Sequence, residues 1–320
     1  MSDVVITARE VRKSFDEVGV LESVDLTVKE NEILLLMGPN GVGKSVLLSC
    51  LAGSARPTAG SVDVFGEPAT GRADTTSFLL QDALCHEKLT GWENVDFYRR
   101  LHPAFTDDWQ HLVDRFGIDD DLEKPVEDYS GGMTRKLELA IAASIDVPIY
   151  LYDEPTAALD LTTVQTVHEL FREQQAAGKS LLVASHRPMD ADVADRVAFL
   201  AEDGIVATGR PDDLLASLPP IVETGTANTN ALAETIEGEP YAVAGNVRGF
   251  LSEDCDSDRD TDGCDSNDHD TDVGARTAEA LLDDAAAEIE MDDLTLVEPT
   301  YTDLFNYYTE SGPQRDEGFR

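Results

Sequence analysis

A glycine-rich segment between an apolar stretch and a helical pattern constrains the fold of this chain most. The stretch Ile33–Met37 precedes it, and the helical pattern continues to Leu51. A strand, such a loop and a helix are the context in which G-x-x-x-x-G-K-[ST] binds phosphate, and a chance glycine-rich turn would not explain that context. Backbone N–H groups would surround the phosphates, Lys44 would reach the β- and γ-phosphates, and the Ser45 hydroxyl would ligate Mg²⁺. The segment consists of Gly38, Pro39, Asn40, Gly41, Val42, Gly43, Lys44 and Ser45.

Two adjacent acids end a second apolar stretch. Ile149–Tyr152 predicts a buried strand, and Asp153 and Glu154 follow it. Adjacent side chains on a strand point in different directions, so the two acids can take different roles. Asp153 would belong to the Mg²⁺ shell, and Glu154 would orient the attacking water and accept its proton. The alternative is a solvated strand end, which is weaker because strand ends beside a phosphate loop are where nucleotide chemistry occurs.

A third motif opens a helix. Ser130, Gly131 and Gly132 precede a helical pattern that runs to Ala140. A helix N-terminus offers free N–H groups and partial positive charge to an anion, and glycines let the backbone approach it closely. If the anion is a γ-phosphate bound by a second subunit, the motif predicts a chain that dimerises around ATP.

The pattern of apolar runs predicts an α/β fold in residues 1–218. Early strand candidates precede the phosphate loop, and residues 83–135 read as a small helical subdomain. Beyond that subdomain, strands alternate with helices, which indicates a parallel sheet covered by helices. The later strand candidates are Ile149–Tyr152, Ser180–Ala184 and Val197–Ala201.

Residues 219–320 read as a separate, small α+β module that begins at Pro219-Pro220. We expect a βαβ-type arrangement, with a helix over 230–237 and a strand or hairpin over 241–251. Residues 252–272 are almost entirely polar and acidic, which predicts a flexible insertion. Asp258–Gly263 matches the start of a calcium loop, but His269 replaces the usual final Glu, so a solvated acidic insertion is the stronger of two open alternatives.

The charge of the chain is extreme. Asp and Glu number 64 against 24 Lys and Arg, for a net charge of -40. Such a surface repels nucleic acid, so we expect no nucleic-acid partner. It resembles that of proteins from salt-loving archaea, where a Debye length of about 3 Å at 1 M salt screens self-repulsion. One acidic tail on an ordinary protein explains only part of the excess, because acids also dominate 107–128 and 190–213.

Over about residues 4–215, the order of the motifs resembles the ATP-binding subunit of ABC transporters. The resemblance implies a P-loop NTPase fold: a RecA-like parallel sheet, an N-terminal antiparallel β part and the inserted helical subdomain. It also implies that ATP and Mg²⁺ bind. The motifs after the phosphate loop are Gln81, Ser130–Gly132, Asp153–Glu154, Asp160 and His186.

The resemblance assigns roles to residues that the patterns alone do not. Phe15 would stack on adenine, and Gln81 would touch Mg²⁺ and the water and couple to the permease. Ser130–Gly132 would contact the γ-phosphate held by the other subunit. Asp160 would lie at the dimer interface. His186 would contact the γ-phosphate, although a histidine taken alone can also be structural.

Departures from the usual motifs are few, and some point to a subfamily. Met133 stands where Gln is commoner, and Leu161 where Pro is usual. Met133 followed by the basic pair Arg135-Lys136 is similar to subunits that energise polytopic export permeases. The segment 297–305 is similar to the closing segment of those subunits.

The resemblance implies an ATPase subunit that powers a separate permease, of the ABC-2 export type, as one of two identical copies. Since no apolar run reaches the ~18–20 residues of a membrane span, we expect a cytoplasmic chain bound to the inner face of the membrane through that permease. The first alternative is a soluble ABC-type ATPase with a non-transport partner. The second, nucleotide binding without turnover, is disfavoured because Glu154 and His186 are present.

The charge generates a prediction about salt. The protein should lose its fold on transfer to low salt, because unscreened repulsion among the acids destabilises the compact state. Far-ultraviolet circular dichroism before and after desalting measures this, and an unchanged spectrum would contradict it.

Overall fold

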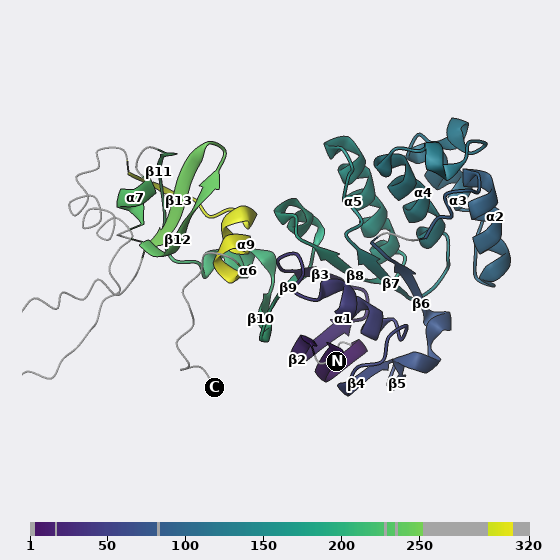
Figure 1. The fold of residues 1–320 in the computed structure, drawn as a ribbon, viewed down its shortest axis with the longest axis horizontal. Helices are drawn as coiled ribbons and strands as arrows, with labels where there is room; N and C mark the ends of the chain where they lie inside the picture. The colour runs from purple at the N-terminus through teal and green to yellow at the C-terminus, as the bar shows by residue number, and fades with distance from the viewer. Residues whose placement is uncertain are drawn as a thin grey trace, which may run out of the picture. The chain divides into compact units, whose positions relative to one another are not determined.

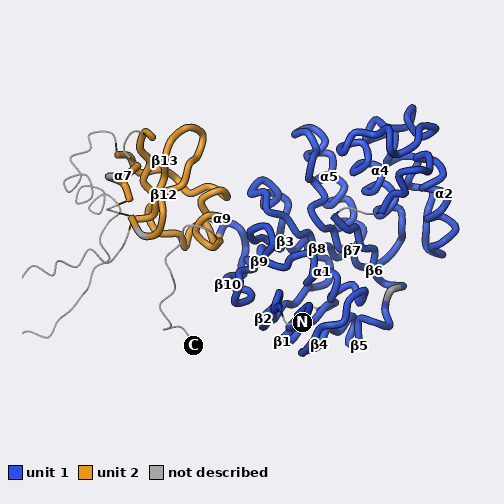
Figure 2. The backbone as a smooth tube through the Cα atoms, in the orientation of Figure 1, with its two compact units in different colours: residues 1–212 blue, residues 213–320 orange. Residues whose placement is uncertain are grey.

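The computed structural model describes residues 4–16, 18–81, 84–226, 229–233, 236–251 and 294–309. The chain divides into two compact units, residues 1–212 and 213–320 (Figure 2). This division lies a few residues before the expected boundary at 218. The expected acidic insertion, 252–272, and the calcium-loop pattern within it lie outside the described residues. None of the helices in the described ranges is long and apolar enough to cross a bilayer.

A six-stranded sheet forms the centre of the first unit, in the order β10-β9-β3-β8-β7-β6 (Figure 1). β9, β3, β8, β7 and β6 are parallel, and β10 pairs antiparallel with β9. This confirms the predicted parallel sheet. Its central strands read as unbroken apolar runs because both faces are covered. The strands are β3 (Ile33–Met37), β6 (Thr76–Leu79), β7 (Ile149–Asp153), β8 (Ser180–Ser185), β9 (Arg196–Ala201) and β10 (Gly204–Gly209).

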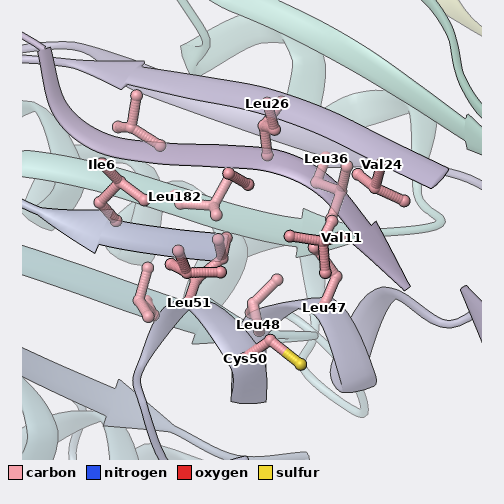
Figure 3. Close-up of a cluster of buried hydrophobic side chains, with 14 of the residues drawn as sticks. Ile6, Val11, Val24, Leu26, Leu36, Leu47, Leu48, Cys50, Leu51 and Leu182 are labelled. Atoms are coloured by element: carbon pink, nitrogen blue, oxygen red, sulfur yellow. The ribbon is translucent and has the colours of Figure 1, made fainter. Parts of the chain in front are cut away.

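An antiparallel sheet in the order β2-β1-β4-β5 forms the N-terminal part of this unit. Helix α1 (Lys44–Leu51) packs against both sheets, and its Leu47, Leu48 and Leu51 are fully buried (Figure 3). These leucines meet side chains from both sheets, such as Ile6 and Leu36. The strands are β1 (Val4–Phe15), β2 (Val18–Lys29), β4 (Ala59–Val64) and β5 (Glu67–Pro68).

Helix α5 (Leu161–Ala176) covers the other face of the central sheet. On β7, Leu151 belongs to the core around α1, whereas the next side chain, Tyr152, stacks on Phe171 of α5 at 4.9 Å. Because successive strand side chains point to opposite faces, α1 and α5 lie on opposite sides of the sheet.

Helices α2 (Gly91–Leu101), α3 (Trp109–Arg115) and α4 (Gly131–Ala143) form the helical subdomain (Figure 1). Thr90 caps α2 in a reciprocal capping box with Glu93, which satisfies two N–H groups at the helix start. In α4 the apolar face is buried, while its first turn, with the Ser130 motif, remains accessible.

The second unit is α+β, but its sheet is entirely antiparallel, in the order β12-β13-β11-β14. β11 and β12 nevertheless run parallel, because each pairs antiparallel with β13 between them, and α7 connects them along the chain. The expected βαβ-type arrangement is therefore present, with β13 inserted between its two strands. The expected helix over 230–237 is a single turn, α7, and residue 236 already belongs to a strand. The elements are α6 (Pro211–Ala216), β11 (Ile221–Gly225), α7 (Thr229–Leu232), β12 (Ile236–Val243), β13 (Asn246–Leu251), β14 (Thr295–Val297) and α9 (Tyr301–Thr309).

A two-residue turn explains the antiparallel pairing. Val243 pairs with Asn246, and both turn residues between them, Ala244 and Gly245, have positive φ, 50° and 91°. This is the backbone of a tight hairpin turn that matches strand twist. An Ala-Gly turn is a weak sequence signal because alanine rarely adopts positive φ.

Asp303 generates a stability prediction for this unit. Its fully buried carboxylate accepts hydrogen bonds from Tyr241 Oη at 2.9 Å, Arg248 Nη1 at 2.8 Å and Thr300 N at 2.7 Å. Asp303→Ala should cost about 3–5 kcal/mol, because it leaves the largely buried Arg248, whose side chain is 13% exposed, without one of its two carboxylate partners. Urea unfolding monitored by circular dichroism measures the loss. Glu239→Ala, at an exposed position of β12, is the control, and equal midpoints for the two variants would contradict the prediction.

Candidate functional site

The predicted phosphate loop, acidic pair and histidine follow three adjacent strands of the central sheet. In the parallel register, Met37 pairs with Ser185, and Asp153 pairs with Ala184. The carboxyl ends of β3, β8 and β7 therefore reach the same edge, which is where ligands bind in open α/β sheets. The Glu154 N–H extends the ladder by donating to the Ala184 carbonyl at 2.9 Å.

The loop between β3 and α1 depends on two of its glycines. Gly43 has φ +105°, and a Cβ there would lie 2.8 Å from Leu21 Cδ2. A Cβ on Gly38 would lie 2.4 Å from the Leu200 carbonyl oxygen. Both positions therefore require glycine, because β2 and β9 approach the loop too closely for a side chain.

Lys44 lies at the centre of the site and is only 6% exposed. Its ammonium donates to the carbonyls of Gly38 at 2.7 Å and Pro39 at 3.1 Å, and lies 3.6 Å from Glu154 Oε1. Burial lowers the pKa of Lys44, and the carboxylates of Glu154 and Asp153 oppose that shift. The buried Lys44 ammonium is thus held by two carbonyls of the phosphate loop that precedes it.

Glu154 is 4% exposed and has φ +49°, a backbone conformation that residues other than glycine seldom adopt. Its Oε2 accepts a hydrogen bond from His186 Nδ1 at 2.9 Å. One carboxylate thus joins the β7 end to the β8 end through His186 and to the phosphate loop through Lys44. The His186 side chain is 41% exposed, so the cluster opens to solvent on that side.

Asp153 is 1% exposed, and neither of its carboxylate oxygens has a hydrogen-bond partner among the described residues. Burial raises its pKa, and the nearby Ser45 hydroxyl opposes the shift, although the two groups do not reach hydrogen-bond geometry. An unpartnered buried carboxylate beside a hydroxyl fits the oxygen ligands that Mg²⁺ prefers. Ser45 and Asp153 are thus the residues that could hold the metal.

The Ser130 motif and Asp160 start two helices. Ser130 Oγ accepts from Met133 N at 3.3 Å, and Asp160 Oδ1 accepts from Thr163 N at 3.0 Å. The Thr163 N–H lowers the pKa of Asp160 most. A Cβ on Gly131 would meet nothing within 4 Å, whereas one on Gly132 would lie 3.1 Å from the carbonyl of Ala158. The start of α4 thus lies beside the segment that leads to Asp160 and is open at Gly131.

Phe15 and Gln81 are exposed, unlike the buried Lys44 and Glu154. Phe15 ends β1, is 49% exposed, and has Lys13 Nζ 4.9 Å from its ring centroid. Gln81 follows β6, the strand next to β7, and its side chain is exposed. Its carbonyl accepts from Arg135 Nη1 at 3.4 Å.

Sequence reasoning missed two buried polar groups near the site. Arg135, read only as a subfamily feature, contacts the ends of both β6 and β7. Asp190 accepts hydrogen bonds from Thr156 at 2.8 Å and Ser185 at 2.6 Å, and contacts His168 at 2.8 Å. The only sequence signal for Arg135 was a charge within the apolar face of its helix, three residues before Glu138.

Comparisons with known proteins show the family of this chain. The family model described as ABC transporter matches residues 21–157. A daunorubicin resistance ATP-binding protein from Streptomyces coeruleorubidus is 31% identical over 68% of this chain and 71% of its own length. The Nod factor export ATP-binding protein I of Sinorhizobium fredii is 30% identical over 78% of this chain and 75% of its own length.

Solved structures show the same fold. A dimeric bacterial ABC transporter cassette has a TM-score of 0.59 and 24% identity, and the match covers 64% of this chain and 98% of that one. The ATP-binding subunit of another ABC transporter has a TM-score of 0.61, with 66% of this chain covered. With the P-loop, the acidic strand end and the histidine on adjacent strands, the chain belongs to the ATP-binding proteins of ABC transporters, which are P-loop ATPases.

Proposed function

We propose that this chain is the ATP-binding and ATP-hydrolysing subunit that powers a separate membrane permease, an exporter of the ABC-2 type. The observation that carries the hydrolytic part is the contact of Glu154 with both Lys44 and His186, at 3.6 Å and 2.9 Å. The export part is supported by relatives named for daunorubicin resistance and Nod factor export. The resemblance of the segment 297–305 to the closing segment of export subunits also favours an exporter.

The placement of these groups supports the following hydrolytic step. The P-loop N–H groups and Lys44 hold the β- and γ-phosphates, and Phe15 stacks on the adenine. Glu154 orients a water in line with the γ-phosphorus and accepts its proton as the new P–O bond forms and the bond to the β,γ-bridging oxygen breaks. His186 holds that carboxylate and reaches the γ-phosphate. Ser45, Asp153 and Gln81 would hold Mg²⁺, which would supply positive charge against the charge that develops on the phosphate oxygens.

We infer that two copies close around two ATP molecules. Ser130, Gly131 and Gly132 of one copy would donate backbone N–H groups to the γ-phosphate held by the other, which the open space at Gly131 allows. Asp160 and the 60% exposed Leu161 would lie at the interface. ATP then favours the closed dimer and hydrolysis releases it, so the permease can follow the cycle from the inner face of the membrane.

Glu154→Gln tests the hydrolytic assignment. We expect ATP turnover to fall by more than about a hundredfold, because the amide cannot accept the proton. ATP binding should persist, since the P-loop is untouched, and an ATP-bound dimer should accumulate in gel filtration. Turnover at the wild-type rate would overturn the role of Glu154.

The same background tests the Ser130 motif. Adding Ser130→Arg should preserve ATP binding and abolish the ATP-dependent dimer, because a long side chain blocks the approach of the second phosphate. If the double variant still dimerises with ATP, the contact between subunits proposed for this motif is wrong.

The permease assignment has its own prediction. A gene beside this one should encode a chain with about six apolar segments of bilayer length. Co-expressed with this chain, that product should retain it in washed membranes and release it on detergent extraction as one complex. Absence of such a gene, together with this chain sedimenting with ribosomes, would favour the soluble alternative.

A further inference from the structure

Arg135 lies in the second turn of α4 and is only 5% exposed. A guanidinium is costly to bury unless it is paired and hydrogen-bonded. Its charge is balanced by Glu138, also buried, whose Oε2 lies 3.0 Å from Nη1. The ion pair therefore belongs to the interior of the unit rather than to its solvated surface.

One amino group of Arg135 reaches the end of β6. Nη1 donates to the carbonyls of Leu80 at 2.8 Å and Gln81 at 3.4 Å. Glu138 Oε1 accepts from the N–H groups of Leu84 at 3.1 Å and Cys85 at 3.4 Å. The segment that carries Gln81 is thus held on both sides by one ion pair from the helix that the Ser130 motif opens.

The other amino group reaches the end of β7. Nη2 donates to the carbonyl of Asp153 and, at 3.0 Å, to that of Glu154. Glu154 is the residue with φ +49°, and this backbone aims its carboxylate at His186 and Lys44. A strained backbone persists only where its surroundings hold it, and the guanidinium fork supplies two of those contacts.

We propose that Arg135 is a positioning residue for hydrolysis: it ties the helix behind the Ser130 motif to the Gln81 segment and to the Glu154 backbone. The inference rests on the proposed hydrolytic role of Glu154. Arginine is required because its planar fork serves several carbonyls at once, whereas a lysine ammonium cannot span both strand ends. Movement of α4 on contact with a second subunit would then be transmitted to both segments.

The test compares Arg135→Lys and Arg135→Met with Arg115→Met. Arg115 also joins the helical subdomain to the rest of the unit, through ion pairs with Glu169 and Glu173 at 3.0 Å and 2.7 Å, but both of these partners lie on α5, outside the site. It therefore controls for loss of an arginine between these parts. Arg135→Lys keeps the charge opposite Glu138, so it remains informative if the methionine variant does not fold.

Steady-state ATPase kinetics and ATP binding give the main readout. Both Arg135 variants should lower kcat by about ten- to a hundredfold, since displacements of a catalytic group near 1 Å have effects of that size. The Kd for ATP should stay within about twofold, because Lys44 and the loop are untouched. A kcat within about twofold of wild type, or a raised KM with unchanged kcat, would overturn the proposal.

A double-mutant cycle separates positioning from general stabilisation. If Arg135 acts through Glu154, then Arg135→Lys should cause little further loss in single-turnover hydrolysis when Glu154→Gln is already present. Full additivity of the two losses would show that Arg135 acts independently of Glu154, against the proposal.

Hydrogen exchange supplies a readout that needs no turnover. In Arg135→Lys, peptides covering 84–89 and 150–158 should exchange faster than in wild type or Arg115→Met. If the wild type hydrolyses no ATP, the proposed function fails while exchange still decides whether Arg135 holds these segments. Unchanged exchange in both peptides would refute the inference.

Discussion

The hydrogen-bonded register of the parallel strands β3, β8 and β7 is the constraint on which the site depends. Met37 pairs with Ser185 and Asp153 with Ala184, so the residues that follow emerge at one level of one edge. A one-residue slip of β7 would turn Glu154 to the opposite face of the sheet. Because α1 and α5 pack on opposite faces, the core resists such a slip, and the stability of the sheet also preserves the geometry of the chemistry.

The charged groups at this edge are buried together rather than solvated. Lys44, Glu154 and Asp153 are each less than a tenth exposed, and burial shifts the pKa of Lys44 downward and that of Asp153 upward. Such groups destabilise a fold unless they pair, and Asp153 has no hydrogen-bond partner among the described residues. The site therefore keeps charged groups available for binding at the expense of stability. This is expected if, as in the function we propose, a nucleotide and a metal supply the missing partners.

Part of the molecule could be predicted because its signals are local. The parallel sheet followed from unbroken apolar runs between helical patterns. The placement of Lys44, Asp153 and Glu154 at one edge of that sheet followed from motifs with defined flanking elements. The second unit shows the limit of this reasoning. Its antiparallel hairpin depends on a positive φ at Ala244, a conformation that an alanine in the sequence does not predict. Its helix α7 ends after one turn, which the sequence pattern did not predict either. The hairpin and the short helix both depend on which strands pair with one another, and strand pairing is not a local property of the sequence.

The sequence by itself determined the family, the P-loop and the order of the motifs, since each is a short pattern whose chemistry depends on spacing along the chain. Only the tertiary structure decided which of these groups touch. The contact of His186 with Glu154 joins residues 32 apart. The reach of Arg135 to both strand ends spans up to 55 residues. Contacts at such separations are set by strand register and helix packing, because the chain between them can fold back in many ways until the sheet selects one.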